Sequence, residues 1–292
     1  MKVLVTGAGG FLGRNLAESL CPQYDVCGPS RAELNLLDAD AVRECLRLHR
    51  FDAVVHAATV RANRRIGAPP GMLQDNCRMF FNLARNSGSF GKLLFLSSGA
   101  VYDRRGPVAR ISETCFDSRV PADPYAFSKY ICAHHIAQSA NLFELRLFGV
   151  FGPHEDWQIR FLSNACCRAM WDLPVTLKQN ARFDYLDVAD LGKLIRWFLD
   201  SQPRHRAYNV CTGRAVDLAA LGRKVVCASG KKLDVLVRDP GLGQEYSGDN
   251  RRLLEELPGF QFRPLDDSIH ALYRWYLDRK QTIDPERLHF DA

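Results

Sequence analysis

A tyrosine, a lysine and a serine stand at positions from which they can move a proton. Tyr125 and Lys129 are four positions apart in a segment predicted to be helical, so their side chains lie on one face. A phenol has a reference pKa near ~10, but a neighbouring ammonium stabilises its phenolate and makes it a useful acid–base group. Ser98 follows the apolar run Leu93–Leu96, where its hydroxyl can hydrogen-bond the same reacting oxygen. The group predicts proton transfer to a carbonyl or from a hydroxyl.

A second motif, near the N-terminus, is suited to holding a dinucleotide. Three glycines, at positions 7, 10 and 13, follow the apolar run Lys2–Thr6 and open a predicted helix over Phe11–Cys21. Such glycines allow a tight turn and close backbone approach to a pyrophosphate, which then faces the positive end of the helix. The residues predicted to contact the cofactor here are Gly7, Gly10, Phe11, Leu12 and Gly13. Together the two motifs predict a nicotinamide-dependent enzyme.

The end of the second predicted strand, Tyr24–Cys27, bears on which dinucleotide binds. An NAD site usually carries an acidic residue there for the ribose hydroxyls. From Val26 through Arg31 the chain has no acid, and the next one is Glu33, whereas Arg31, helped by Ser30, is suited to a ribose 2′-phosphate. NADP(H) is therefore favoured, NAD remains possible, and the alternative for Arg31 is a solvated loop arginine. Asp38 fits either an adenine contact or the cap of the following helix.

Composition points to a globular enzyme and excludes several classes. The 292 residues are 47% apolar, enough for one large α/β domain with a smaller lobe. No apolar run approaches the ~18 residues of a membrane span, and the N-terminal run lacks the length of a secretory signal. The ten cysteines lack paired ligand spacing, which predicts reduced thiols in a cytoplasmic protein without a metal site. The net charge of +6 is dispersed, which argues against nucleic-acid binding.

Strand and helix signals alternate through the first half of the chain. Strands are predicted over Lys2–Thr6, Tyr24–Cys27, Ala53–His56, Lys92–Leu96, Phe143–Leu147 and Ala207–Val210, and helices over Phe11–Cys21, 38–48, Met72–Asn86, 123–140 and Asp187–Leu199. This alternation predicts an α/β fold, a doubly wound parallel (Rossmann) sheet with helices on both faces.

After Gly152 the alternation loosens, which predicts a second unit. Residues 1–152 and 183–212 are assigned to the dinucleotide-binding domain, and residues 153–182 and 213–292 to a smaller mixed C-terminal substrate lobe. Residues 153–182 are expected to be helix and then loop, and Ile269–Leu277 an aromatic helix. Ligands of such folds bind at the carboxyl ends of the strands, so the site is expected between sheet and lobe.

These motifs resemble the extended short-chain dehydrogenase/reductase family, the group of nucleotide-sugar epimerases, reductases and dehydratases. The similar segments run through nearly the whole chain: Thr6–Gly13, His56–Ala58, Leu96–Tyr102, Pro124–Lys129, Leu145–Pro153, Phe183–Leu191 and Tyr208–Gly213. The resemblance implies that Ser98, Tyr125 and Lys129 are the catalytic triad and that Ala57, Ala58 and Lys129 also contact the cofactor. The segment Arg31–Asp38 resembles the NADP-binding segment of GDP-fucose synthase-type reductases.

Departures from the family pattern narrow the reaction. GDP-fucose synthase-type enzymes carry a cysteine two residues after the serine and a histidine in the lobe, for a double epimerisation. Here Ala100 takes the place of the cysteine, and His154 lies too early in the chain to match the histidine. Dehydratases carry an Asp-Glu pair where Gly99 and Ala100 stand. Double epimerisation and dehydration are therefore disfavoured, which leaves redox chemistry at one carbon.

The resulting prediction is NADPH-dependent reduction of a 4-keto, 6-deoxy nucleotide sugar with Tyr125 as proton donor. An NAD-dependent nucleotide-sugar 4-epimerase is the first alternative. A non-catalytic, dinucleotide-binding regulatory protein is an alternative of another class. Epimerisation beside the ketone by other residues also stays open.

The resemblance implies that a nucleotide diphosphate sugar lies between lobe and sheet. Guanidinium groups suit its phosphates, with solvated arginines as the alternative. The residues expected to contact the substrate are Ser98, Gly99, Ala100, Arg160, Asn164, Arg182 and Arg251, and further candidates are Arg168 and Lys178.

Four ring-bearing residues have an open role. Trp157 and Trp171 are base-stacking candidates or core residues, and His56 and His154 are possible proton carriers, with His56 expected to be packed. The resemblance also implies a homodimer that pairs through the helix carrying Tyr125 and its neighbour. Ile131, Ile136 and the run Met79–Phe81 suit either such an interface or the core.

Overall fold

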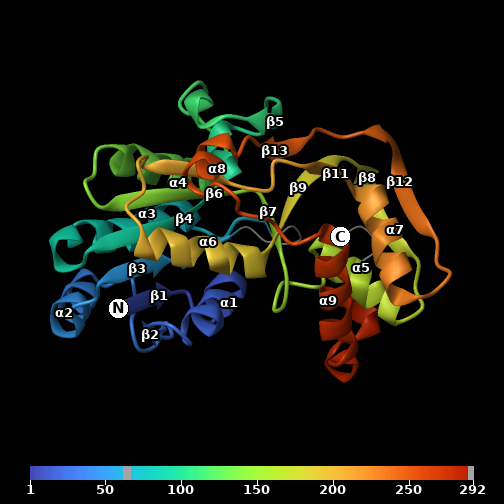
Figure 1. The fold of residues 1–292 in the computed structure, drawn as a ribbon, viewed down its shortest axis with the longest axis horizontal. Coiled ribbons are helices and arrows are strands. Elements are labelled where there is room, and N and C mark those ends of the chain that lie inside the picture. Colours follow the sequence, from blue (N-terminus) through green and yellow to red (C-terminus); the bar gives the residue numbers. More distant parts are fainter. Residues whose placement is uncertain (62–66, 289–292) are drawn as a thin grey trace.

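A parallel sheet of six strands forms one half of the molecule (Figure 1). The computed structural model describes residues 1–61 and 67–288. The strand order is β10-β6-β4-β3-β1-β2, and every neighbouring pair is parallel. The strands are β1 (Lys2–Thr6), β2 (Asp25–Cys27), β3 (Ala53–His56), β4 (Lys92–Ser98), β6 (Leu142–Leu147) and β10 (Ala207–Val210). The chain leaves β1 for β2 and then crosses back to β3, so the order reverses beside β1, where such folds bind ligands.

Helices cover both faces of this sheet, which confirms the predicted doubly wound Rossmann fold. Val3 and Val5 pack with α1 (Phe11–Leu20) and α6 (Val188–Asp200) on one face. The intervening Leu4 packs on the other face, which is covered by α2 (Ala39–His49), α3 (Met72–Ala84) and α4 (Pro124–Ala137). Alternate residues of a strand point to opposite faces, so a strand buried on both sides reads as a continuous apolar run.

The first helix shows how the sequence pattern produces this packing. Leu12, Leu16 and Leu20 recur at helical spacing and lie in the same apolar cluster as Val3 and Val5. Leu16 and Leu20 are fully buried. Burying a leucine side chain stabilises the fold by roughly 1.5–3 kcal/mol, so this stripe alone fixes the helix on the sheet. The glycine turn that precedes the helix is thereby held at the carboxyl end of β1.

A second sheet joins the Rossmann half to the lobe, and its strands come from both of the predicted units. Its strand order is β11-β9-β13-β5, with β7 also paired to β9. The strands are β5 (Val108–Ile111), β7 (Gly149–Phe151), β9 (Arg182–Asp187), β11 (Ala215–Asp217) and β13 (Tyr246–Gly248). The prediction assigned β5 and β9 to the dinucleotide-binding domain, but both pair with β13, which comes from the predicted lobe. A composition shift marks where the alternation ends and cannot reveal this pairing across the chain.

The lobe is a packed helical cluster with a small sheet of its own (Figure 1). It is formed by α5 (Phe161–Met170), α7 (Leu218–Ser229), α9 (Leu265–Leu277), β8 (Val175–Asn180) and β12 (Val235–Leu242), and α8 (Arg251–Glu256) lies nearer the Rossmann sheet, against β10. The expectation of a loop at the end of 153–182 is wrong, because β8 pairs in parallel with β12. The alternating apolar residues Val175 and Leu177 are both buried, a period-two signal that the sequence reading missed.

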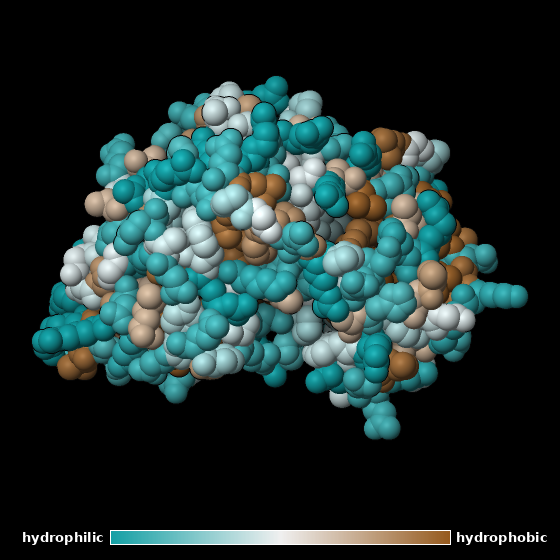
Figure 2. Space-filling model, viewed as in Figure 1, coloured by the Kyte–Doolittle hydropathy of each residue, from teal (hydrophilic) through white to brown (hydrophobic). Residues whose placement is uncertain are grey.

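Strand β12 has an irregular outer edge. Its register against β8 shifts between Asp239 and Leu242. Leu236, Val237 and Leu242 are among the most exposed large apolar side chains of the described residues. Figure 2 shows this face of the molecule as mostly hydrophilic, with apolar patches near its middle and on the lobe side.

The apolar residues of α3 and α4 that suited either an interface or the core mostly serve the core. Met79, Phe80 and Ile136 are buried in the cluster between these helices and the sheet, and Phe81 packs against its edge. Among the described residues, no helix is long and apolar enough to cross a membrane.

Candidate active site

The turn between β1 and α1 is built so that only glycine fits at its critical positions. Gly7 has φ +72°, and a Cβ there would lie 2.7 Å from the Ala58 backbone. A Cβ on Gly13 would lie 2.1 Å from the Gly7 carbonyl oxygen. Both distances are impossible for a real side chain, so the turn packs backbone against backbone. It leaves the N-terminus of α1, capped by Gly10, open at the carboxyl edge of the sheet.

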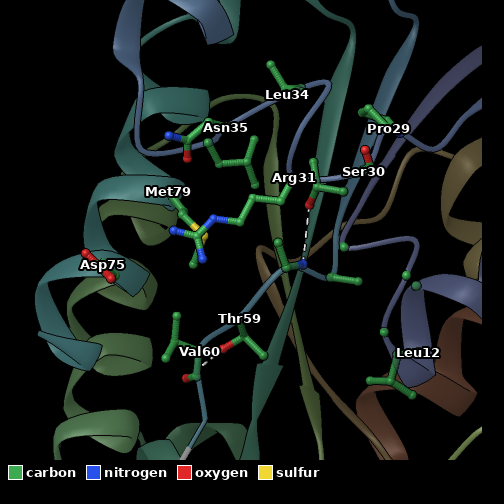
Figure 3. A pocket seen from close by; sticks show the side chains of 18 of the residues that line it. Leu12, Pro29, Ser30, Arg31, Leu34, Asn35, Thr59, Val60, Asp75 and Met79 are labelled. Atoms are coloured by element: carbon green, nitrogen blue, oxygen red, sulfur yellow. Dashed lines mark hydrogen bonds between the residues drawn. The ribbon is translucent and has the colours of Figure 1, made fainter. Parts of the chain in front are cut away.

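A cavity of about 490 Å³ lies over this turn. Most of the predicted cofactor residues line it: Gly7, Gly10, Phe11, Leu12, Gly13, Ser30, Arg31, Ala57 and Ala58. Figure 3 shows the Arg31 side chain reaching across the cavity toward Met79 of α3. Within residues 1–61 and 67–288, the Arg31 guanidinium has no ion-pair partner, so its charge is available to a ligand.

Glu33, the first acid after β2, is turned away from the role of a ribose ligand. Its carboxylate accepts a hydrogen bond of 2.7 Å from the Ser30 backbone N–H. This bond lowers the Glu33 pKa and holds the carboxylate against the loop backbone. The cavity lining at this place is therefore Pro29, Ser30 and Arg31, without an acidic residue.

Asp38 caps a helix and does not line this cavity. Its carboxylate accepts hydrogen bonds of 3.0 Å from the backbone N–H groups of Asp40 and Ala41 at the start of α2. Of its two open readings, the capping role is the one the structure supports. Leu36 and Leu37 line the cavity at this place, and the adenine contact stays a prediction.

The catalytic candidates meet at the carboxyl ends of β4 and β6. Asp123 caps α4 by accepting from the Ala126 N–H at 2.9 Å, and Pro124 occupies the first turn. One turn on, the Lys129 ammonium is buried and donates to the Leu96 carbonyl at 3.0 Å. It lies 5.7 Å from the centroid of the Tyr125 ring. The strand end and the helix thus position the tyrosine, the lysine and Ser98 together.

The charges around Tyr125 favour its phenolate. Burial raises the pKa of this phenol, but nearby cations and a hydrogen bond from Ser98 outweigh burial and lower it overall. The cations are Lys129, Arg61 and Arg160. Burial also lowers the Lys129 pKa, while the neighbouring Tyr125 opposes that shift. A phenol with a lowered pKa can exchange a proton with a substrate oxygen at moderate pH.

Comparison with known proteins decides the family. A profile of the NAD dependent epimerase/dehydratase family matches residues 3–211. This chain belongs to that family. It is an NAD(P)-dependent enzyme of the extended short-chain dehydrogenase/reductase type, as the motifs predicted.

Individual relatives agree with this assignment. The chain is 31% identical to GDP-L-fucose synthase from Azorhizobium caulinodans, over 97% of this chain and 98% of that protein. A GDP-L-fucose synthetase from Naegleria fowleri bound to NADP has the same fold, with a TM-score of 0.82 and 18% identity over 96% of this chain and 94% of that one. A UDP-glucose 4-epimerase from Thermus thermophilus in complex with NAD has a TM-score of 0.79 and 25% identity over 94% of this chain and 99% of that one.

Next to the candidate triad of this epimerase/dehydratase family member lies a tyrosine that the sequence analysis did not find. The Tyr246 hydroxyl lies 3.4 Å from Ser98 Oγ. Tyr246 comes from β13, 148 residues after the serine in the chain. It carries no local motif, so only the fold brings it to the site. Gly99 provides room for it, because a Cβ there would lie 2.8 Å from the Tyr246 hydroxyl.

Two arginines contribute charge to the enzyme's catalytic group. Arg160, a predicted substrate residue, is the N-cap residue of α5 and lies close enough to lower the Tyr125 pKa. Arg61 does the same and also lines the cofactor cavity, although the sequence analysis did not assign it to the site.

The remaining predicted substrate residues are not gathered at this point. Arg251 is exposed and paired with Asp249 at 2.5 Å. Arg182 is paired with Glu245 at 3.6 Å on the second sheet. Asn164 is buried and donates to the Gln158 carbonyl at 3.2 Å, which stabilises the turn before α5. Arg168 is buried and donates to the Pro174 carbonyl at 2.6 Å, and Lys178 is exposed on β8.

The two histidines of interest lie outside the catalytic group. His56 is buried and its Nδ1 lies 2.7 Å from Thr6 Oγ1, and burial lowers its pKa to about 3. It is therefore the neutral, packed residue that was expected. His154 lies beside Glu18, at 3.8 Å, and Trp275, in a separate cavity between α1 and the lobe. Figure 2 shows the surface indented between the two halves at its lower edge.

The tryptophans and a missed carboxylate belong to the lobe. Trp157 and Trp171 pack against its apolar cluster. Glu155 is buried and accepts from Ser163 Oγ at 2.6 Å, and burial raises its pKa to about 7. Within residues 1–61 and 67–288, no group of histidine, cysteine and acidic side chains could hold a metal ion.

Proposed function

We propose that the enzyme reduces a 4-keto, 6-deoxy nucleotide sugar with NADPH and that Tyr125 donates the proton. The observation that carries the proposal is that Tyr125, Lys129 and Ser98 lie together near the carboxyl end of β4, with Ala100 two residues after the serine. An alanine can neither remove nor supply a proton. The name and full-length coverage of the Azorhizobium relative support a nucleotide sugar as the substrate class.

In this proposal the chain's own residues handle the proton. Bound NADPH would supply the hydride that the carbonyl carbon receives. Tyr125 Oη donates its proton to the carbonyl oxygen and becomes a phenolate. The Lys129 ammonium and the Ser98 hydroxyl stabilise that negative charge, so a ketone becomes a secondary alcohol. Arg160 and Arg61 add positive charge near Tyr125, and guanidinium groups suit the phosphates of such a substrate.

The preference for NADP(H) rests on the end of β2. Arg31 reaches into the cavity, and Glu33 is engaged by the Ser30 backbone. A guanidinium forms strong, charge-assisted hydrogen bonds with a phosphate, whereas it gains little from ribose hydroxyls. The NADP-bound Naegleria structure shares this fold, which is compatible with this choice.

A 4-epimerase is the second candidate function. The likeness to an epimerase in complex with NAD favours it, and the same tyrosine and serine would serve there. An epimerase returns the hydride to the same sugar and therefore retains its NAD. A reductase exchanges its dinucleotide in every turnover.

Cofactor exchange therefore tests the proposal. The first measurement is the dinucleotide content of the purified protein, followed by calorimetric affinities of the apo protein for NADPH and NADH. We expect exchangeable, preferential NADPH binding and oxidation of NADPH by 4-keto-6-deoxy nucleotide sugars. Tightly retained NAD with isomerisation of the sugar would establish the epimerase instead. Tight binding without turnover of any sugar would favour a regulatory protein.

We also propose that the enzyme is a homodimer in the cytoplasm. The proposed contact is α4 with its neighbour α3, whose partly exposed Phe81 and Ile131 remain for an interface. Sedimentation of the protein at micromolar concentration tests this, and a monomer throughout would contradict it.

A further inference from the structure

Ser98 has more hydrogen-bonding neighbours than its single proton can serve. Its Oγ accepts from the Ala100 backbone N–H at 3.2 Å. The Tyr246 hydroxyl lies 3.4 Å from Ser98 Oγ, and Tyr125 is close enough for a hydrogen bond with Ser98 to lower its pKa. A serine hydroxyl offers one donor and two acceptor sites. Since the amide fills one acceptor site, one phenol must donate to Ser98 and the other must accept its proton.

The two phenols differ in how readily they ionise. Burial raises the pKa of Tyr246 to about 12, so this phenol keeps its proton at neutral pH. Tyr125 faces the cations Lys129, Arg61 and Arg160, and its pKa is lowered. Tyr246 faces Arg104, the buried thiol Cys211 and Tyr125 itself. The nearby cations therefore favour an anion on Tyr125, whereas burial keeps Tyr246 neutral.

The Tyr246 ring is fixed from several sides. The Arg104 guanidinium carbon lies 4.7 Å from its centroid, and the Phe148 and Phe183 rings lie 5.0 Å and 5.7 Å away. Strand β13 pairs on both sides, with β9 and β5. The hydroxyl therefore reaches Ser98 from a rigid support, as a positioning group requires.

We propose that Tyr246 is a positioning residue: its hydroxyl donates to Ser98 Oγ and thereby directs the Ser98 proton to Tyr125 Oη. This inference rests on the proposed role of Tyr125. When Tyr125 gives its proton to the substrate oxygen, the phenolate accepts from Ser98, and Ser98 accepts from Tyr246. No proton leaves Tyr246. The arrangement therefore moves no charge from Tyr125 and only stabilises its phenolate. Hydrogen bonds to a charged acceptor are the stronger ones, which sets this direction.

The test is a phenolate titration of the apo protein, followed by ultraviolet absorbance. Tyr246→Phe removes the hydroxyl and keeps the ring that packs against Arg104 and Phe148. We expect the Tyr125 transition to move to higher pH by about one unit, a tenfold change in its ionisation constant. Tyr24→Phe is the matched control, because its phenol, hydrogen-bonded to Asp200 at 2.9 Å, also has a pKa of about 12 and lies at the opposite edge of the sheet.

A double substitution separates positioning from direct contact. In a Ser98→Ala background, Tyr246→Phe should produce no additional shift, because the hydroxyl through which Tyr246 acts is gone. The Ser98→Ala shift itself should be at least as large as that of Tyr246→Phe. An equal shift of Tyr246→Phe with and without Ser98, or no shift in either background, overturns the proposal.

Turnover supplies a readout that a structural role would not move. We expect Tyr246→Phe to lower kcat about tenfold with little change in the KM for NADPH, and to move the alkaline limb of the pH–rate profile upward. An unchanged limb overturns the proposal. The low-pH phenolate transition is assigned by Tyr125→Phe. If Tyr125→Phe keeps both the low-pH phenolate transition and turnover, the proposed function of Tyr125 is wrong. That outcome differs from every result that would overturn the role of Tyr246 alone.

Discussion

The cofactor cavity and the substrate side of the same enzyme are built in different ways. The cavity floor is backbone, set by Gly7, Gly13 and Ala58 within consecutive strand–helix turns. The proposed substrate side is made of side chains from segments far apart in the chain, such as Ser98, Arg160 and Tyr246. A ligand held by a turn leaves a contiguous motif in the sequence. A ligand held by side chains of several elements leaves scattered residues without a pattern.

The largest effect is expected where the two regions meet, at Tyr125. Tyr125→Phe should lower turnover by ~10²–10⁴-fold, because the proton donor is lost, while dinucleotide affinity stays within about twofold. Initial rates and calorimetry measure the two quantities. Tyr130→Phe, which removes a phenol from the same helix, is the control and should be nearly neutral for turnover. Full activity of Tyr125→Phe would contradict the assignment of binding to the cofactor cavity and of proton transfer to the substrate side.

A backbone-built cavity should tolerate no side chain at its closest approach. Gly13→Ala places a methyl group 2.1 Å from the Gly7 carbonyl oxygen, whereas a Cβ on Gly9 meets no atom within 4 Å. We expect Gly13→Ala to lose ~1–3 kcal/mol of unfolding free energy and most dinucleotide affinity. Gly9→Ala, the matched control, should change both much less. Equal behaviour of the two variants in thermal unfolding and binding would contradict the close-packed turn.

Arg31 is the side chain that we propose to determine which dinucleotide this cavity prefers. Arg31→Ala should weaken NADPH binding by about 10–100-fold and NADH binding little, since only the former offers a 2′-phosphate. Competition calorimetry gives both affinities for the variant and for Arg47→Ala, an exposed arginine paired with Glu44 at 2.7 Å. Equal weakening of NADPH and NADH would remove the argument for a reductase.

Asp38 gives the smallest and most selective effect. Asp38→Ala should cost about 1 kcal/mol of stability through the lost cap of α2. Dinucleotide affinity should not change, because its carboxylate is engaged by two backbone N–H groups. Asp38→Asn should retain most of the stability. A clear loss of dinucleotide affinity in Asp38→Ala, with unchanged stability, would favour the adenine contact instead.

Much of the fold could be predicted because it depends on local periodicity. The helical spacing of Leu12, Leu16 and Leu20 predicts α1, and continuous apolar runs predict β1, β3 and β4. Strand β8 was missed because its short alternation, Val175 and Leu177, precedes polar residues and is stabilised by the distant β12. The pairing of β9 across the two predicted units could not be read from the sequence for the same reason, since its partners come from elsewhere in the chain.

The site divides along the same line. The glycine turn and the pair Tyr125 and Lys129 could be read from spacing, because each lies within one element. Arg251 and Arg182 have suitable chemistry but are paired elsewhere, and no spacing reveals a partner such as Asp249. Tyr246 could not be predicted from the sequence, because it lies on a three-residue strand and only the fold brings its phenol to Ser98.

The irregular strand β12 has a consequence for solubility. An edge strand with exposed Leu236 and Val237 is a template on which another chain could add a strand and begin to aggregate. The register shift after Asp239 bends that template, and Pro240 lacks an N–H to donate to an incoming strand. The charged pair Arg238 and Asp239 stands between the two apolar stretches. The edge of β12 therefore offers an incoming strand only a short straight segment, which is too short to nucleate an ordered assembly.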